Sequence, residues 1–297
     1  MTVRRPLAAA LCALAALTSA ACGNSSDPST VTGPSKGVVG TPGTGGLPPA
    51  IRAKGVITVA ADATYAPNEF IAPDGKTVVG LDADLAKSIG AQLGLRVNVV
   101  NVTFDAIIPG LAAGKYDLGM SSFTDTKARE QKLDFVTYFS AGTSFYAKAG
   151  GATGIASLAD LCGHTVAVEK GTTQLDDATK AGTDCVKAHK KGVKVQSYPD
   201  QNAANLALNS GRADVGMADS PVAAYQVKRS NGGFVLLGQP YGTAPYGIAI
   251  PKGNGMAKPI LDAVKALIAN GTYGHLLANY GVQAGAITTP VINGATS

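Results

Sequence analysis

The sequence predicts an α/β fold made of two similar lobes, each a mostly parallel β-sheet flanked by helices. Three observations predict it. Short apolar strands alternate with amphipathic helices along the chain, a ten-residue pattern occurs twice, and the part able to fold is about 245 residues long. Alternating strands and helices favour parallel sheets, and a body of this length is long enough for two domains.

The first 21 residues have the features of a secretory signal peptide. Arg4 and Arg5 precede an apolar run from Leu7 to Leu17, and small residues lead from there to Cys22. This run is about half of the roughly 20 residues that a membrane-spanning helix needs. The alternative of a permanent transmembrane anchor is therefore disfavoured.

Residues 18–23, Thr-Ser-Ala-Ala-Cys-Gly, resemble a bacterial lipobox, which implies that Cys22 is acylated and becomes the mature first residue. Ser19 stands where such motifs usually have leucine, so ordinary secretion with cleavage nearby remains open. Residues 22–50 are mostly Gly, Ser, Thr, Pro and Val without apolar periodicity. They predict a lipid-anchored, disordered tether.

The charge and composition point to no nucleic-acid partner. The chain has 25 Lys and Arg against 20 Asp and Glu, and removal of residues 1–21 leaves 23 basic and 20 acidic residues. The basic residues are scattered and only 6% of residues are aromatic. Phosphate-binding patches and base-stacking surfaces are therefore not expected.

Two cysteines remain once Cys12 leaves with the signal peptide and Cys22 takes the lipid. Cys162 and Cys185 can then form a disulfide. The alternative is a metal or redox site, but the spacing is not CxxC and neither neighbouring histidine, His164 or His189, has a zinc-motif interval. We expect a structural disulfide and no metal.

Each lobe is predicted from its own run of elements. The first has a strand at 56–60, a helix with an apolar face from 81 to 93, a strand at 97–100, a helix from 104 to 111 and a strand at 118–120. The second has a strand at 165–168, a helix after Thr172, a strand at 193–195, a helix from Asn202 and a strand at 215–217.

The repeated pattern supports this plan. Residues 111–120, LAAGKYDLGM, align without gaps to residues 208–217, LNSGRADVGM. Each copy reads as a helix end, a glycine C-cap, a basic turn and a strand. Chance remains an alternative because small α/β units share turn chemistry, but two similarly built lobes explain the match better.

Ligands of open parallel sheets bind beyond the carboxyl ends of the strands. In this chain those positions are residues 62–68, 121–124, 169–174 and 218–219, which are rich in carboxylates, hydroxyls and glycine.

The same positions carry a family resemblance that extends from Gly55 to Tyr280. The matching segments are DATYAPNEF at 62–70, VGLDADL at 79–85, FDAIIPGL at 104–111, MSSFTDTKAR at 120–129, GTTQ at 171–174 and YGIAIPKG at 246–253. With them the chain resembles the extracellular solute-binding proteins of polar amino-acid ABC importers. It resembles lysine/arginine/ornithine-, histidine- and glutamine-binding proteins, and the most similar branch binds lysine, arginine, ornithine or histidine.

The resemblance implies the two-lobe periplasmic-binding-protein (Venus flytrap) fold. Residues 51–140 plus 246–297 would form lobe 1 and residues 141–245 lobe 2, with hinge crossings near Ala141 and Pro245. It also implies a monomer without a cofactor, anchored to the membrane as a lipoprotein, that binds a free amino acid and delivers it to an ABC permease.

The resemblance and the chemistry of a free amino acid together assign roles to the candidate ligand-binding residues. Arg129 would bind the α-carboxylate through its forked guanidinium, with backbone N–H groups near Thr124 and Thr173. Asp219 would bind the α-ammonium with Ser122 and Thr124. Arg129 could instead be a surface charge, and Asp219 a helix N-cap.

The remaining candidates concern the ligand side chain. Tyr65 and Phe104 would sandwich it, although Phe104 also continues an apolar helix face. Asp62 and Glu169 would pair with a basic group, but a surface role for Glu169 stays open, so lysine, arginine or ornithine is only slightly favoured over glutamine or glutamate. Asn68 stands where the family usually has an aromatic residue. Ser121, Thr172 and Gln174 complete the candidate set.

Two other functions remain as alternatives: an extracellular amino-acid sensor module and a dehydratase-type enzyme on the same fold. The sequence has no GxSxG motif and no phosphate loop. Its three histidines, His164, His189 and His275, lie away from the predicted strand tips. We therefore expect binding and not catalysis.

Overall fold

An eight-stranded β-sheet organises the part of the chain that the structure describes. The structure is a computed structural model that describes residues 46–296, which belong to one unit of residues 41–297. The strand order is β5-β1-β6-β11-β7-β10-β8-β9, and a second sheet contains β2-β3-β4. Within residues 46–296, no helix combines the length and the apolar character needed to cross a membrane.

The strands of the large sheet are β1 (Val56–Ala61), β5 (Arg96–Asn101), β6 (Leu118–Gly119), β7 (Leu133–Lys148), β8 (Thr165–Glu169), β9 (Lys194–Tyr198), β10 (Val215–Asp219) and β11 (Phe234–Pro251). The small sheet consists of β2 (Thr64–Tyr65), β3 (Glu69–Ile71) and β4 (Val78–Val79). The helices are α1 (Pro49–Lys54), α2 (Leu81–Gln92), α3 (Phe104–Ala112), α4 (Lys127–Glu130), α5 (Thr173–Lys187), α6 (Gln201–Asn209), α7 (Ser220–Arg229), α8 (Ala257–Ala269) and α9 (Thr272–Tyr280).

Strands β5, β1 and β6 form one end of the sheet. Together with helices α1–α4, α8 and α9 we call them the first half. β1 pairs in parallel with both β5 and β6. The predicted apolar face of α2 is buried in a core shared with α8, in which Leu85 and Val264 are fully buried. The predicted strand and helix order of this half is confirmed.

The other end, the second half, consists of β10, β8 and β9 with α5–α7. β8 pairs in parallel with β9 and β10, as the alternation of strands and helices predicted. Its core is built from alternate residues of these strands, among them Val166, Val168, Val215 and Met217. The fold class is therefore confirmed: a mostly parallel sheet flanked by helices at both ends.

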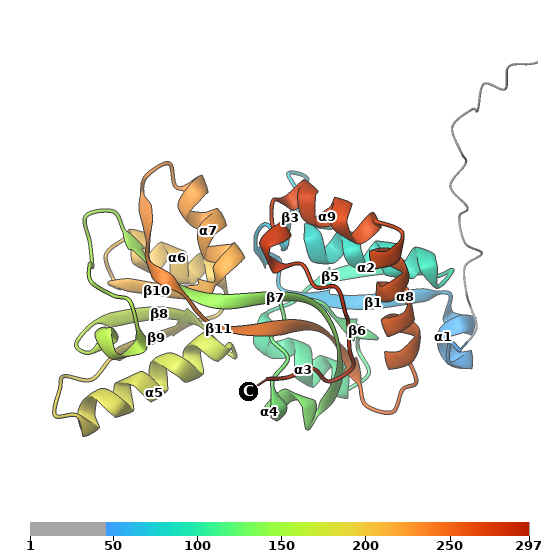
Figure 1. Ribbon diagram of the computed structural model, residues 1–297, viewed down its shortest axis with the longest axis horizontal. Helices are drawn as coiled ribbons and strands as arrows, with labels where there is room; N and C mark the ends of the chain where they lie inside the picture. Colours follow the sequence, from blue (N-terminus) through green and yellow to red (C-terminus); the bar gives the residue numbers. More distant parts are fainter. Residues whose placement is uncertain (1–45, 297) are drawn as a thin grey trace, which may run out of the picture. The chain divides into compact units, whose positions relative to one another are not determined.

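Two long antiparallel strands connect the halves (Figure 1). β7 and β11 pair along most of their length, with Ala141 opposite Ala244 and Ser140 opposite Pro245. A third core cluster contains residues of both halves, including Phe104 and Ile107 from α3 and Leu208 from α6. The halves are thus in contact. The division into lobes at residues 51–140 plus 246–297 and 141–245 stays a prediction.

The two copies of the repeat make the same hydrogen bonds. Gly114 and Gly211 both have the positive φ of a helix C-cap, 67° and 72°. After each glycine, an aspartate binds the start of a neighbouring parallel strand. The Asp117 carboxylate accepts from Thr58 N at 2.7 Å, and the Asp214 carboxylate accepts from Thr165 N at 2.7 Å. The sequence match therefore reflects a repeated structural unit.

The tether prediction needs a correction at its end. The sequence predicts a disordered tether over residues 22–50. In the structure, however, Leu47 is only 3% exposed and packs in the core of the first half, and α1 begins at Pro49. Proline is well suited to the first turn of a helix, so Pro49 starts a helix here instead of extending a linker. The signal peptide, Cys22 and the tether up to residue 45 lie outside the described residues.

The predicted disulfide is present in the second half. Cys162 and Cys185 are bonded, with a sequence separation of 23 residues and a Cα–Cα distance of 5.6 Å. The bond ties the turn before β8 to the C-terminal part of α5. Neither cysteine belongs to the cavity described below, so its role is structural.

Replacing both Cys162 and Cys185 with serine should lower the free energy of unfolding by about 3 kcal/mol, because the unfolded chain regains the entropy of an open loop. Urea denaturation without reductant measures this change. Wild-type protein in dithiothreitol should match the double variant. Equal denaturation midpoints for oxidised wild-type protein and the variant would contradict a stabilising disulfide.

Candidate ligand-binding site

A cavity lies where the carboxyl ends of β6, β8 and β10 meet the starts of α3, α5 and α6. Most of the predicted site residues line it: Tyr65, Phe104, Ser122, Thr124, Arg129, Thr172, Thr173, Gln174 and Asp219. Three further residues, Gln201, Ala218 and Val222, complete the lining. Three predicted residues, Asp62, Ser121 and Glu169, are buried but do not line the cavity.

Arg129 projects from the short helix α4. Its Nη1 donates to the carbonyl oxygen of Thr124 at 2.8 Å, and its Nη2 donates to the carbonyl oxygen of Gly171 in the second half at 3.0 Å. Cζ lies 4.5 Å from the ring centroid of Phe123. Burial lowers the pKa of Arg129 to about 10, although the negative charge of Asp219 acts in the opposite direction. Because this value is still well above 7, the side chain stays cationic at neutral pH. A guanidinium has five N–H donors, so these bonds leave donors for an anion.

Asp219 is the corresponding acidic group at the end of β10. Its two carboxylate oxygens accept from Gln174 Nε2 and from the hydroxyl of Tyr246, each at 2.7 Å. Asp219 precedes α7 but makes no side-chain cap bond, so the N-cap alternative accounts only for its position and not for its contacts. Burial raises the pKa of Asp219 to about 6, although these two hydrogen bonds favour the ionised form and act to lower the pKa.

Helix α5 begins at the cavity. Thr172 is its N-cap, and its hydroxyl accepts from Leu175 N at 3.2 Å and donates to the carbonyl oxygen of Glu169 at 2.8 Å. The first N–H groups of a helix lack partners within the helix and carry partial positive charge. Thr173 and Gln174 therefore place an anion-attracting helix end opposite Arg129.

The serines after β6 have different roles. Ser121 is fully buried, and its hydroxyl accepts from Asp62 N at 2.8 Å, which ties the ends of β1 and β6 together. Ser122 has a positive φ of 49°, and its backbone N–H donates to Asp82 at 2.8 Å. Ser122 lines the cavity, and its hydroxyl accepts from Asn68 Nδ2 at 2.9 Å and donates to the Glu69 carboxyl at 3.3 Å. Asn68 thus supports Ser122 from behind and is not a wall of the cavity.

A buried pair of acids lies behind Ser122. Glu69 and Asp82 are 0% and 1% exposed, and Asp82 accepts from the hydroxyl of Tyr138 at 2.7 Å. Burial raises the pKa of Asp82 to about 6. Burial and the charge of Asp82 raise the pKa of Glu69 well above its usual range. Two buried acids this close hold one proton between them at neutral pH.

Asp62, Tyr65 and Glu169 form an acidic cluster beside the cavity. Asp62 accepts from Thr64 Oγ1 at 2.6 Å and from Phe104 N at 3.0 Å. Both carboxyl oxygens of Glu169 and the hydroxyl of Tyr65 are buried and make no hydrogen bond of good geometry among residues 46–296, although Tyr65 and Asp62 lie beside the Glu169 carboxyl. Burial and the charge of Asp62 raise the pKa of Glu169 to about 10, and burial also raises that of Asp62. The surface role considered for Glu169 is wrong, since it is 1% exposed.

The aromatic residues differ from the expected sandwich. The rings of Tyr65 and Phe104 are 5.9 Å apart at 63°, an edge-to-face contact with each other. Phe104 also packs on Phe123 at 4.7 Å because it starts α3 within the third core cluster. Phe104 is therefore both a core residue and part of the cavity wall, and no gap for a side chain separates the two rings.

The sequence interpretation missed Gln201, which is 3% exposed and donates through Nε2 to the hydroxyl of Tyr146 at 2.8 Å. The repeat contained the signal that would have found it. Extended back to the helix starts, the gapless alignment of residues 111–120 with 208–217 places Gln201 opposite Phe104. α3 and α6 begin at these equivalent positions, and both residues line the cavity.

Contacts between the halves surround the cavity. Lys170 Nζ lies 2.7 Å from the carboxylate of Asp105. Gln201 N donates to Thr64 Oγ1 at 3.2 Å, in addition to the bond from Arg129 to Gly171. The site residues are thus held in a closed arrangement.

Known proteins are similar to this chain in sequence and in fold. Residues 57–283 match the family described as bacterial extracellular solute-binding proteins, family 3. The chain is 32% identical to the arginine-binding protein ArgT of Corynebacterium glutamicum over 248 residues, 83% of this chain and 81% of that protein.

Solved structures give the same result. An ancestral arginine-binding protein bound to arginine has a TM-score of 0.71 and 35% identity, covering 76% of this chain and 98% of its own. An ancestral amino acid-binding protein described as a precursor of cyclohexadienyl dehydratase has a TM-score of 0.67 and 34% identity, covering 78% and 97%. The chain belongs to the family 3 bacterial extracellular solute-binding proteins and has the fold of periplasmic amino-acid-binding proteins.

Proposed function

We propose that this protein binds a basic L-amino acid, with arginine favoured, as the extracytoplasmic component of an ABC importer. The observation that carries the proposal is the acidic cluster of Asp62, Tyr65 and Glu169. Its buried oxygens without partners are best satisfied by a cationic group that donates several hydrogen bonds. Buried polar groups in proteins are almost always paired, and unpaired ones often mark a ligand or an ion.

A guanidinium suits this cluster better than an amide. It is planar, permanently charged and can donate to two carboxylates at once. The Glu169 carboxyl, neutral at pH 7 by its raised pKa, would ionise when a cation lies beside it. Two proteins similar to this chain, the arginine-binding protein ArgT and the ancestral arginine-binding protein bound to arginine, support the same ligand.

The α-groups of the ligand have matching partners at the other end of the cavity. Arg129 and the start of α5 together suit a carboxylate, because a guanidinium and unpaired helix N–H groups both donate to anions. The ionised Asp219, with the hydroxyls of Ser122 and Thr124, suits an ammonium. A ligand held by Arg129 on one side and by Asp219 and Thr173 on the other would favour the closed state.

In this role the closed protein would present its ligand to an ABC permease. The proposal includes anchoring through a lipid on Cys22, which stays a prediction from the sequence.

A second candidate, catalysis, has one observation in its favour. A buried carboxyl with a pKa of about 10 beside a cavity is a group that could donate a proton, and one structural relative is described as the precursor of a dehydratase. The named relatives are themselves binding proteins. Incubation with prephenate-type acids should therefore leave the substrate unchanged, and product formation detected by chromatography would favour the enzyme.

Replacing Arg129 with alanine should weaken binding of every amino acid by at least about 100-fold, because all share the α-carboxylate and Asp219 loses its cationic neighbour. Isothermal titration calorimetry measures the loss. Arg229→Ala, which removes an exposed arginine at the end of α7, is the matched control and should bind normally. Near-normal affinity of Arg129→Ala would overturn the placement of the site.

Binding of arginine should release a proton from Glu169. In the closed arrangement, burial and the charge of Asp62 raise the pKa of the Glu169 carboxyl to about 10, and a bound cation would lower it. Because the ionised form binds, the association constant should rise with pH, by up to about tenfold per unit between pH 6 and pH 8.

Calorimetry in buffers of different ionisation enthalpy measures this proton. Glutamine binding should show little pH dependence, and Glu169→Gln should flatten the arginine profile and reduce the preference for arginine over glutamine. A flat profile for arginine with wild-type protein would show that Glu169 does not face the ligand cation.

A further inference from the structure

The segment of residues 291–295 follows the region that matches the family, which ends at residue 283. It runs beside β7 as an added edge: Ile292 forms a bridge with Val136, and Thr137 N donates to the carbonyl oxygen of Val291 at 2.9 Å. Asn293 N donates to the carbonyl oxygen of Phe135 at 2.9 Å, and its side-chain oxygen accepts from Phe135 N at 2.8 Å. These bonds fix the segment in a defined register.

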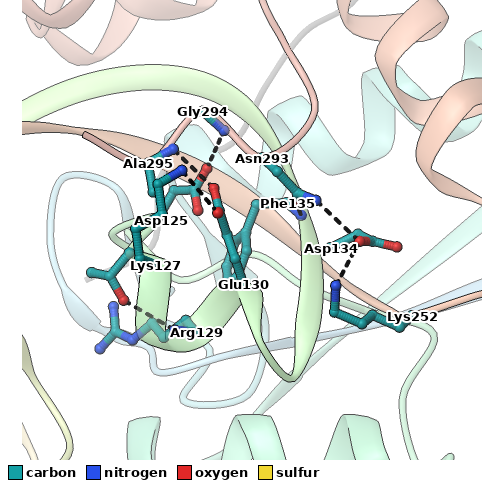
Figure 2. A network of polar contacts seen from close by, with 11 residues as sticks. Asp125, Lys127, Arg129, Glu130, Asp134, Phe135, Lys252, Asn293, Gly294 and Ala295 are labelled. Carbon is teal, nitrogen blue, oxygen red and sulfur yellow. Dashed lines mark hydrogen bonds and ion pairs between the residues drawn. The ribbon is translucent and has the colours of Figure 1, made fainter. Parts of the chain in front are cut away.

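Beyond Asn293 the segment binds both ends of α4 (Figure 2). Gly294 N donates to the carboxylate of Asp125 at 2.8 Å, and Ala295 N donates to the carboxylate of Glu130 at 3.0 Å. Asp125 precedes the helix, and Glu130 is its last residue. The two acids flank the residue that carries the site's guanidinium, Arg129.

α4 needs external support because it is only four residues long. A helix of one turn fixes several dihedral angles for very few internal hydrogen bonds, so it is unstable by itself. Its internal contacts include the Thr126 cap bond to Arg129 N at 3.2 Å and the exposed Lys127–Glu130 ion pair. Asp125 is fully buried, so without Gly294 its carboxylate would lose a donor that water cannot readily replace.

We propose that residues 291–295 are a positioning element for Arg129: by holding Asp125 and Glu130 they fix α4 and thereby aim the guanidinium at the ligand carboxylate. The inference rests on the proposed function, because it concerns the same carboxylate. Val291 and Ile292 contact β7, and only Gly294 and Ala295 reach α4. The part of the segment that affects binding is therefore distinct from the part that docks it.

Gly294→Pro tests this role in the full-length chain. Proline lacks the N–H that binds Asp125, and a Cβ at this position would lie 2.8 Å from side-chain atoms of Thr137 and Val291. Amide hydrogen exchange of Ala295 reports whether the segment has left α4. We expect affinity for arginine and for glutamine to fall by the same factor, about tenfold, because preorganisation of the shared carboxylate site is lost.

Lys252→Ala is the matched control from the same network. Lys252 pairs with Asp134 at 3.4 Å and does not contact α4, so its loss should leave both affinities unchanged (Figure 2). A double-mutant cycle with Arg129→Lys separates positioning from general destabilisation. If the segment acts through the guanidinium, Gly294→Pro adds little to the loss already caused by Arg129→Lys.

Three results would each overturn the role of the segment. The two losses of affinity could be additive in the cycle, or the ratio of arginine affinity to glutamine affinity could change. The affinity could also stay normal although the Ala295 amide exchanges rapidly. If Gly294→Pro fails to fold or stays docked, the double variant Asp125→Ala/Glu130→Ala decides by the same criteria. Wild-type protein that binds no amino acid would instead overturn the proposed function and, with it, this inference.

Discussion

The antiparallel pairing of β7 with β11 is the constraint on which the site depends. These two strands connect the halves of the sheet, and they also carry residues that hydrogen-bond to residues lining the cavity. Tyr246 of β11 donates to Asp219, and Thr143 of β7 accepts from Gln174. Tyr246 also forms a bridge with Thr124, and Pro245 accepts from Asp125 N. The loop that leads to Arg129 is thus attached to the same strand pair that positions Asp219.

The site combines this rigid frame with acids that the fold leaves partly unpaired. Burying a charged carboxyl without a partner is unfavourable, and burial raises the pKa of Glu169 to about 10. Glu69 and Asp82 reduce the unfavourable free energy of burying two carboxyl groups because they share one proton. Asp82 also accepts hydrogen bonds from Ser122 N and from the hydroxyl of Tyr138. The acid pair keeps one unpaired oxygen on each residue, whereas both carboxyl oxygens of Glu169 are unpaired among residues 46–296.

Much of the fold could be predicted because it depends on local patterns. The apolar spacing of α2, the continuous apolar strand β1 and the glycine caps of the repeat all act within a few residues of chain. The site was largely predictable for a related reason, since strand ends such as Asp219 and helix starts such as Thr172 meet at one edge of a parallel sheet. The sequence did not indicate which side chains reach the cavity, because that depends on packing between elements. Asp62, Ser121 and Glu169 are buried one layer behind it, and Leu47 joins the core through contacts with distant residues.

Phe104 and Gln201 occupy equivalent positions in the two copies of the repeat. The two residues start the same structural unit in its two copies, and both line the cavity. One copy supplies an aromatic ring and the other an amide, while the caps and strand contacts of both units are the same. Either wall can therefore be exchanged without disturbing the glycine turn or the aspartate that anchors it. Because the unit occurs twice, the residues that line the cavity are separate in the sequence from the glycine turns and the aspartates that fix the neighbouring strands.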